Sequence, residues 1–306
     1  MKTDKVRVVK NGKYLDKFTL SSNELRLLSS ADGVEIMTQT VNKGVIFLVA
    51  PAGDENNINS VMEFFYILEG ELEYLDGDSG KEKLVPGDCF YTQYLKEDCV
   101  FNPITDVKLL YISTQPLFHL IGDSLKDLHK LNEDLQKKDQ YTKSHSERVR
   151  NISLKLAFEM GLNRDSVGNV ALAALFHDVG KIEIPDDILK KEDKLNDEEY
   201  RIIRNHSTRS SSLVKNIEYK DISTIVEQHH ERFDGSGYPH GIKGEDICIE
   251  ARIIAVADTF DAMVSDRPYR AGLKEDVAIA EINQLSGIWY DPDVVDAFNR
   301  MISKKK

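Results

Sequence analysis

The stretch Leu175-Phe176-His177-Asp178-Val179-Gly180-Lys181-Ile182 sets a histidine and an aspartate side by side at the end of an apolar, helical pattern. Asp178 extends the apolar face that Ala171 and Ala174 begin, and His177 lies beside it. An unpaired carboxylate is costly to bury, so Asp178 needs a cation or several donors. Consecutive residues of a helix are about 100° apart, so both side chains can reach one metal cluster from one wall.

Four further histidines and a second aspartate continue apolar helical faces in the C-terminal half. His206, for example, follows Ile202 and Ile203 at helical spacing. A single inward histidine is more often a hydrogen-bonded core residue than a ligand, but seven such positions in one domain are hard to satisfy without cations. Imidazole nitrogens and carboxylate oxygens are the usual ligands of Fe, Mn or Zn. The predicted metal ligands are His145, His177, Asp178, His206, His229, His230 and Asp258.

The ligand set is large enough for two ions, because the two oxygens of Asp178 can bridge them. Two ions about 3.5–4 Å apart suit phosphoester hydrolysis, since they share a water, lower its pKa and neutralise phosphoryl oxygens. The carboxylates are too few for an all-oxygen Mg²⁺ site. One ion would be held by His145, His177, Asp178 and Asp258, and the other by Asp178, His206, His229 and His230.

The length of 306 residues suggests two domains. Residues 1 to about 116 are rich in short apolar runs such as 44–49, 64–68 and 107–112, and the segment Asp76–Gly80 is a turn signal. This pattern predicts a small sandwich or barrel. From about Leu117 the period is helical.

A short connector joins the two parts. Its apolar spacing of four and three is a heptad seam with a polar residue at one inner position, which can fix the register of a two-stranded coiled coil. A single amphipathic helix packed on its own domain explains the same pattern, and both interpretations stay open. The seam consists of Ile121, Leu125, Leu128, Asn132 and Leu135.

Composition excludes several classes of function. A formal net charge of −12 argues against broad nucleic-acid binding, so we expect no DNA partner. No apolar run reaches about 18 residues, and the N-terminus leads into no signal-peptide pattern, so we expect neither a membrane span nor export. Cys89, Cys99 and Cys248 show no paired spacing, which suits a reducing cytoplasm.

The seven candidate ligands and the order in which they occur resemble the HD superfamily of metal-dependent phosphohydrolases. The segment His229-His230-Glu231-Arg232-Phe233-Asp234-Gly235-Ser236-Gly237-Tyr238-Pro239 is similar to the defining stretch of its HD-GYP subgroup, and so is Ser265-Asp266-Arg267-Pro268-Tyr269-Arg270. The resemblance covers roughly residues 139 to 300. It implies an all-α domain and a phosphodiesterase that hydrolyses cyclic di-GMP with two divalent ions, iron or manganese.

The resemblance also implies roles in catalysis and substrate binding. Asp178 and Lys181 would be catalytic, with Lys181 near a substrate phosphate, where its charge stabilises developing negative charge. The alternative is a lysine that the dipole favours at a helix C-terminus, but the motif around Lys181 favours the functional role. Gly237 suits a rigid loop where backbone approaches ligand, and Tyr238 would contact the substrate or merely pack. The planar forks of Arg267 and Arg270 would bind phosphate or a guanine edge, or pair with Asp261 or Asp266.

One position departs from the pattern of some members. A glutamate four residues before the first histidine binds a third metal in those proteins, and here that position is Tyr141. The resemblance therefore favours two ions, and one-step opening of the substrate to linear pGpG over full conversion to GMP.

The N-terminal half resembles a cupin. Glu63–Leu72 and Val85-Pro86-Gly87-Asp88 are similar to the two cupin motifs, but the histidines of metal-binding cupins are missing. We therefore expect a metal-free β-barrel that senses an unknown ligand or dimerises the chain. The chain is predicted to be a multidomain α and β protein: a cupin-like β-barrel at 1–116, a helical connector at 117–138 and an all-α HD-GYP domain at 139–306. A non-catalytic cyclic-dinucleotide receptor, or a phosphodiesterase for another cyclic dinucleotide, is the alternative function.

Overall fold

The structure of the chain is a computed structural model, and it describes residues 8–20, 23–49, 61–76, 80–95, 98–118, 134–135, 138, 140–191, 193–215, 222–266 and 271–304. The chain forms two compact units, Met1–Leu125 and Lys126–Lys306. Most of the predicted connector, including Ile121, Leu125, Leu128 and Asn132 of the heptad seam, lies outside the described residues. The bounds of the connector and its coiled coil stay predictions.

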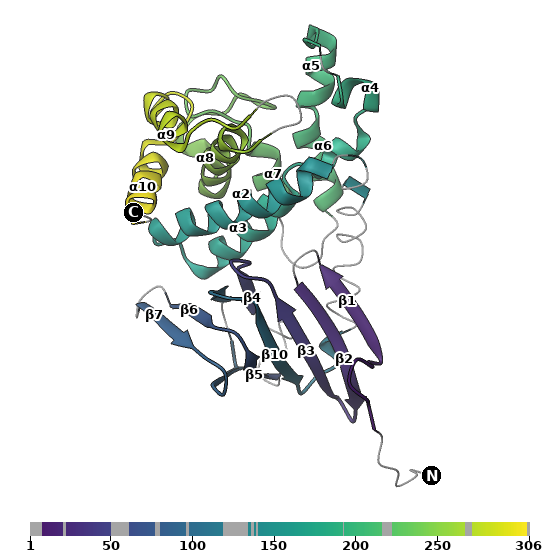
Figure 1. The fold of residues 1–306 in the computed structure, drawn as a ribbon. Coiled ribbons are helices and arrows are strands. Elements are labelled where there is room, and N and C mark those ends of the chain that lie inside the picture. Colours follow the sequence, from purple (N-terminus) through teal and green to yellow (C-terminus); the bar gives the residue numbers. More distant parts are fainter. Residues whose placement is uncertain are drawn as a thin grey trace. The chain divides into compact units, whose positions relative to one another are not determined.

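The N-terminal unit contains two antiparallel sheets, which confirms the β-rich half that the short apolar runs predict (Figure 1). The six-stranded sheet has the order β1-β2-β3-β10-β5-β8 and the four-stranded sheet the order β4-β9-β6-β7. The strands are β1 Asp16–Leu20, β2 Asn23–Ala31, β3 Val34–Val41, β4 Phe47–Val49, β5 Met62–Glu69, β6 Leu72–Asp76, β7 Gly80–Leu84, β8 Cys89–Gln93, β9 Cys99–Pro103 and β10 Val107–Ser113. β6 and β7 pair antiparallel with Asp76 opposite Gly80, and residues 77–79 of the predicted turn lie outside the described residues.

The core of the β unit follows from the alternation along its strands. Every second residue of β10, from Val107 to Ser113, is buried, because successive side chains of a strand point to opposite faces. Phe65 stacks on Tyr111 with ring centroids 4.4 Å apart, and Phe90 continues the stack at 4.7 Å. Large aromatic side chains therefore fill the space between the sheets.

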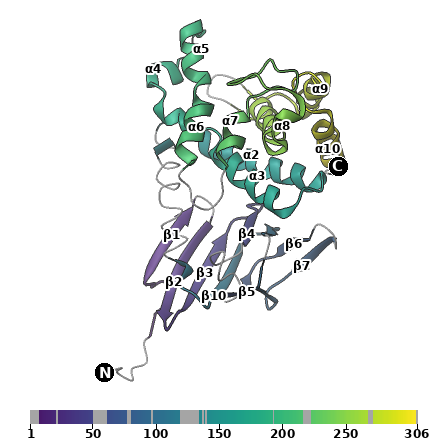
Figure 2. The same cartoon turned by 180° about the vertical axis from the view of Figure 1, so that it is seen from behind.

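The C-terminal unit is helical in the residues that the structure describes (Figure 2). Its α-helices are α2 Gln140–Glu159, α3 Arg164–Phe176, α4 Asp186–Leu189, α5 Asp197–Arg204, α6 His206–Val214, α7 Ser223–Gln228, α8 Ile249–Val264, α9 Glu275–Gln284 and α10 Pro292–Ser303. Two 3₁₀ helices, η1 Val179–Glu183 and η2 Gly244–Asp246, lie between them. No helix in these ranges is long and apolar enough to cross a membrane.

The packing of this unit centres on α2, which contacts α3, α8 and α10. Both ribbon views show α2 and α3 side by side. The buried faces are apolar, with Val149 and Leu156 of α2 and Ile253 and Ile254 of α8 fully enclosed. Burying such side chains contributes about 1.5–3 kcal/mol each, which fixes the helices as a scaffold for the polar residues among them.

Side-chain caps mark the start of two helices, α5 and α3. Asn196 and Glu199 form a capping box at the start of α5, in which each side chain accepts the backbone N–H of the other residue. Asn163 caps α3 by accepting the N–H of Ser166. These caps satisfy donors that the first turn of a helix leaves without partners.

Candidate metal centre

The seven predicted ligands come from separate elements of the helical unit and converge. His145 lies in α2 and Asp258 in α8, while His206 is the first residue of α6. His229 ends α7 and His230 follows it. The His177-Asp178 pair differs from the sequence expectation of one continuous helical face, because α3 ends at Phe176 and Asp178 begins η1 with φ −101° and ψ 2°.

The first group of ligand atoms consists of one ring nitrogen each of His145 and His177 and one oxygen of Asp178, all within 4.8 Å of one another. Nε2 of His145 lies 3.8 Å from Asp178 Oδ2 and 3.1 Å from Asp258 Oδ1. Nε2 of His177 lies 3.4 Å from Asp178 Oδ2 and 4.0 Å from Asp258 Oδ1. Two imidazoles and two carboxylates therefore face one small volume.

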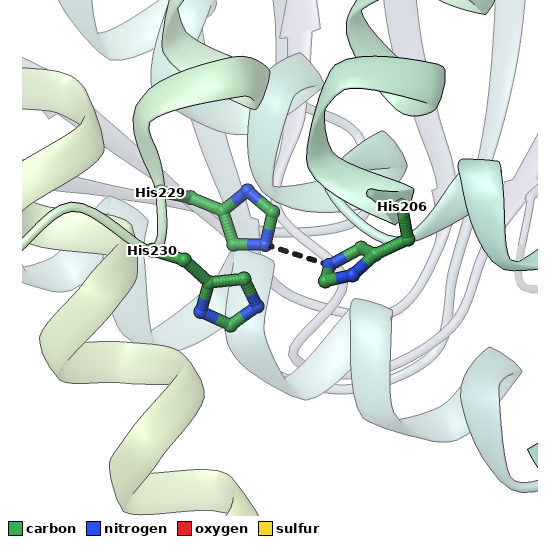
Figure 3. Close-up of side chains that lie close together, drawn as sticks. All are labelled: His206, His229 and His230. Atoms are coloured by element: carbon green, nitrogen blue, oxygen red, sulfur yellow. Dashed lines mark hydrogen bonds between the residues drawn. The ribbon is translucent and has the colours of Figure 1, made fainter. Parts of the chain in front are cut away.

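The second group consists of His206, His229 and His230, whose ligand atoms also lie within 4.8 Å of one another (Figure 3). The Nε2 atoms of His206 and His229 are 3.4 Å apart, as the dashed line in Figure 3 marks. Asp178 joins the two groups, because its Oδ1 lies 3.3 Å from His206 Nε2 while Oδ2 faces His145 and His177.

Three of the histidines are oriented by the same kind of hydrogen bond to the backbone. The Nδ1–H of His177, His206 and His229 donates to the carbonyl oxygen three residues earlier in the chain, at 2.8, 2.7 and 2.6 Å. This bond fixes the tautomer with the proton on Nδ1 and leaves Nε2 free to bind a cation. Local backbone geometry at the helix ends thus orients the donors before any ion binds.

His145 is oriented by a carboxylate instead. Its Nδ1 lies 2.7 Å from Asp261 Oδ2, and Arg148 donates to both oxygens of Asp261 at 2.6 and 2.9 Å. Burial alone would raise the pKa of Asp261, but the hydrogen bonds from His145 and Arg148 lower it on balance. The sequence predicts Asp261 only as a possible ion-pair partner, although its spacing of three from Asp258 on α8 is a signal of this role.

The protonation states suit a cation at this place. Burial lowers the pKa of His206 to about 4 and that of His230 to about 3, and it also lowers the pKa of His229, so these rings are neutral at pH 7. Burial would raise the pKa of Asp178, but the charge of Lys181 and the neighbouring histidines hold it well below the usual range. Buried neutral imidazoles beside ionised carboxylates form a donor set for a divalent metal ion.

One buried ligand atom lacks the partner that a cation would supply. Nε2 of His177 has no hydrogen-bond partner among the described residues, although the side chain is fully buried. A buried polar atom without a partner costs about 1–3 kcal/mol. A bound ion between His145, His177 and Asp178 would satisfy it, so the residues present fit the metal that the sequence predicts.

Two of the predicted substrate-binding residues lie at the centre. Lys181 Nζ lies 2.6 Å from Asp178 Oδ2, and the lysine belongs to η1 rather than to the end of α3. The ring of Tyr238 lies 4.8 Å from that of His230. Arg267 and Arg270 lie outside the described residues, and the structure describes only the backbone of Tyr141.

Gly237 allows the Tyr238 loop to close over the centre. A Cβ atom at Gly237 would lie 2.3 Å from the backbone nitrogen of Arg232, which no side chain tolerates. Buried Glu231 anchors the same loop, since its Oε1 accepts the N–H groups of His240 at 2.6 Å and Gly241 at 3.1 Å. The sequence analysis did not recognise this role of Glu231.

Gly180 permits an equally close approach between η1 and α6. A Cβ atom there would lie 2.3 Å from the carbonyl oxygen of His206. The Gly180 N–H donates to Ser210 Oγ at 2.7 Å, which gives Ser210 a role in docking the two elements. This contact sets Asp178 against His206.

Comparisons with known proteins place this unit in a family. The family model described as HD domain matches residues 130–294. A cyclic di-GMP phosphodiesterase of Thermotoga maritima is 44% identical over 171 residues, which are 54% of this chain and 45% of that protein. A cyclic di-GMP phosphodiesterase response regulator of Xanthomonas campestris is 39% identical over 176 residues, or 56% of this chain and 47% of the relative.

A third relative differs in the substrate that its name gives. A 3'3'-cGAMP-specific phosphodiesterase of Vibrio cholerae is 42% identical over 139 residues, which are 44% of this chain and 32% of that protein. The chain spans about half the length, or less, of these curated relatives. Because the family model covers more than half of the 306 residues and coincides with the helices that carry the histidines and aspartates, the chain belongs to the HD domain family.

Proposed function

We propose that this protein is a metal-dependent phosphodiesterase that opens cyclic di-GMP to linear pGpG. The observation that carries the proposal is the convergence of five histidines and Asp258 around Asp178, whose two oxygens face two groups of imidazoles. The names of the Thermotoga and Xanthomonas relatives support the choice of substrate.

The distances between the ligand atoms support a division of the ligands between two ions. His145, His177, Asp178 and Asp258 would hold one ion, and Asp178, His206, His229 and His230 the other. Two divalent ions supply an activated water and neutralise phosphoryl oxygens. We propose iron or manganese, which the resemblance to the HD-GYP subgroup implies and the mixed imidazole and carboxylate donors permit, and a count of two, because Tyr141 replaces the glutamate of three-metal members.

Residues beside the ions would bind the substrate. Lys181 Nζ lies 2.6 Å from Asp178 Oδ2, so its ammonium group would contact a phosphate bound at the centre. As a point charge it would stabilise the negative charge that develops on the phosphoryl oxygens. Tyr238 would form a wall of the site beside His230, and Arg267 and Arg270 stay proposed contacts to phosphate or guanine.

The proposal is tested by incubating anaerobically prepared, metal-loaded protein with cyclic di-GMP and separating the products by chromatography. We expect pGpG to accumulate, and elemental analysis to give a metal-to-chain ratio near two. Absence of hydrolysis with both iron and manganese under reducing conditions would refute the proposal, and a ratio near three would refute the two-ion count.

Two other functions have specific support. The Vibrio relative is named for 3'3'-cGAMP, so competition between the two dinucleotides measures which one this chain prefers. A receptor without turnover is the other candidate, and tight binding by fully metallated protein that cleaves nothing would establish it. A complete set of seven ligands favours the enzyme, because recognition alone does not require them.

For the β unit we propose a metal-free, cupin-like regulator in a homodimeric, cytoplasmic protein. Glu63, the position of the cupin metal ligand, is buried and accepts hydrogen bonds from Tyr111 and Thr92. Its carboxylate thus has protein donors in place of the histidines that a cupin metal site requires. Sedimentation of the full chain tests the dimer, and metal that stays bound after His145, His206 and His229 are replaced by alanine would contradict a metal-free barrel.

A further inference from the structure

A cleft of about 410 Å³ opens at the junction of α5 and α6. Its volume lies within the range of about 300–1,000 Å³ that small-molecule sites occupy. The walls that matter here are formed by Arg201, Arg204, Asn205, Thr208, Arg209 and Tyr238.

The cleft is basic in an acidic protein. Three arginines and no carboxylate line it, although the chain carries a net charge of −12. Arg201 pairs with Glu198, and Arg209 pairs with Glu183 at 2.8 Å. For Arg204 no carboxylate partner is present in the described parts of the chain, so its donors stay available to a ligand.

Tyr238 connects this cleft to the metal centre. One part of its ring lies against His230, at 4.8 Å between ring centroids, and His206 lies 6.5 Å away. The guanidinium of Arg204 lies over the same ring, 5.4 Å from its centroid. A ligand whose phosphate sits at the histidines can therefore extend past Tyr238 into the arginine cleft.

We propose that the cleft binds one guanine nucleotide of the cyclic dinucleotide and that Arg204 contacts the guanine edge. The inference rests on the proposed phosphodiesterase function and adds the origin of base preference. Guanine presents two acceptors, O6 and N7, which match the two parallel donors of an arginine fork, whereas adenine presents one acceptor and one donor there. Arginine has no acceptor with which to satisfy that donor.

The proposal predicts an order of substrates. Cyclic di-GMP places guanine in the cleft in either orientation, and 3'3'-cGAMP can turn so that its single guanine lies there. Cyclic di-AMP has adenine at both positions and must leave an arginine donor without a partner. We expect cyclic di-GMP and 3'3'-cGAMP to have low KM values and cyclic di-AMP a KM at least about tenfold higher, since one bidentate contact separates the bases.

The test compares Arg204→Gln with the wild type on cyclic di-GMP and cyclic di-AMP. We expect KM for cyclic di-GMP to rise about tenfold, kcat to change much less, and the preference over cyclic di-AMP to be largely lost. Arg204→Lys keeps the charge without the fork, and it should keep part of the base preference, because an ammonium group can also donate to guanine O6 and N7. Arg300→Gln, at an exposed arginine of α10 paired with Glu159, is the control for loss of a surface charge.

The outcomes separate the cleft from the chemistry. If wild-type protein cleaves cyclic di-GMP but Arg204→Gln keeps its KM and base preference, the cleft proposal is wrong. An equal loss for both dinucleotides in Arg204→Gln would indicate a phosphate contact and also overturn it. If wild-type protein binds cyclic di-GMP without cleaving it, the phosphodiesterase proposal fails, and the dissociation constants of the same variants decide the cleft. Metal content and melting temperature equal to those of Arg300→Gln exclude misfolding.

Discussion

Asp261 shows how one residue outside the predicted ligand set governs the metal centre. It accepts a hydrogen bond from His145 at 2.7 Å and two from Arg148, so it orients the imidazole without being a candidate ligand itself. We expect Asp261→Asn to lower metal affinity about 10–100-fold, because such partners keep the ligand's orientation and basicity. Metal titration of chelator-treated protein measures the effect. Asp276→Asn, at an exposed position of α9, is the matched control, and equal affinities in the two variants would contradict the assigned role.

The titration of single histidines gives the metal-free protein a stability optimum. Burial lowers the pKa of His206 from 6.5 to about 4, so its contribution is present above pH 6.5 and is lost as pH falls towards 4. For His145, burial opposes the shift, but Asp258 and Asp261 raise the pKa from 6.5 to about 9. Its contribution is present below pH 6.5 and is lost as pH rises through about 9.

The metal-free protein should therefore be most stable near pH 6.5 and should melt at lower temperature on either side. Thermal melting of chelator-treated protein between pH 4 and pH 10 checks this. His206→Asn should flatten the acidic limb, whereas His240→Gln, at an exposed histidine, should leave both limbs in place. A profile that rises steadily with pH would show that other groups dominate.

At the scale of elements, the contact between η1 and α6 decides whether the two groups of imidazoles share Asp178. We expect Gly180→Ala to destabilise the protein by about 1–3 kcal/mol, because its Cβ would lie 2.3 Å from the His206 carbonyl oxygen and must push the elements apart. Urea unfolding measures the loss, and metal affinity should fall with it. Ser212→Ala on the exposed face of α6 is the control. If Gly180→Ala lowers the free energy of unfolding as little as Ser212→Ala does, α6 can move away from η1 without loss of stability.

The elements also show where sequence patterns were reliable. The capping box at Asn196 and the β6–β7 hairpin follow local rules, so the sequence predicts them correctly. The prediction of one continuous helix through His177 and Asp178 is wrong, because α3 ends at Phe176. The break follows from packing: Gly180 must approach α6, and an uninterrupted α3 would carry Asp178 past His206.

At the scale of the whole molecule, metal binding should stabilise one unit alone. All seven candidate ligands belong to the unit Lys126–Lys306, and none belongs to Met1–Leu125. Saturating metal at about 100 times its dissociation constant adds about 2.7 kcal/mol to the unit that binds it. We expect chelation to lower the melting temperature of one calorimetric transition and to leave the other unchanged. A joint shift of both transitions would show that the units unfold together.

The sequence by itself determined which residues are candidate ligands and which family they resemble. Histidines and aspartates on apolar helical faces are too costly to bury without cations, and this reasoning needs only residue types and a period of 3.6. The alternation of short apolar runs likewise determined the β-rich half. Both inferences depend on local chain geometry, which neighbouring residues fix.

Only the tertiary structure decided how the candidate ligands are grouped, which residues orient them and where a basic cleft lies beside them. Asp178 faces two groups because η1 docks on α6, and Asp261 reaches His145 because α8 packs on α2. Arg204 meets Tyr238 from a segment more than 30 residues away. Such contacts arise between elements remote in the chain, so no periodicity in the sequence encodes them, and packing of the apolar faces sets them.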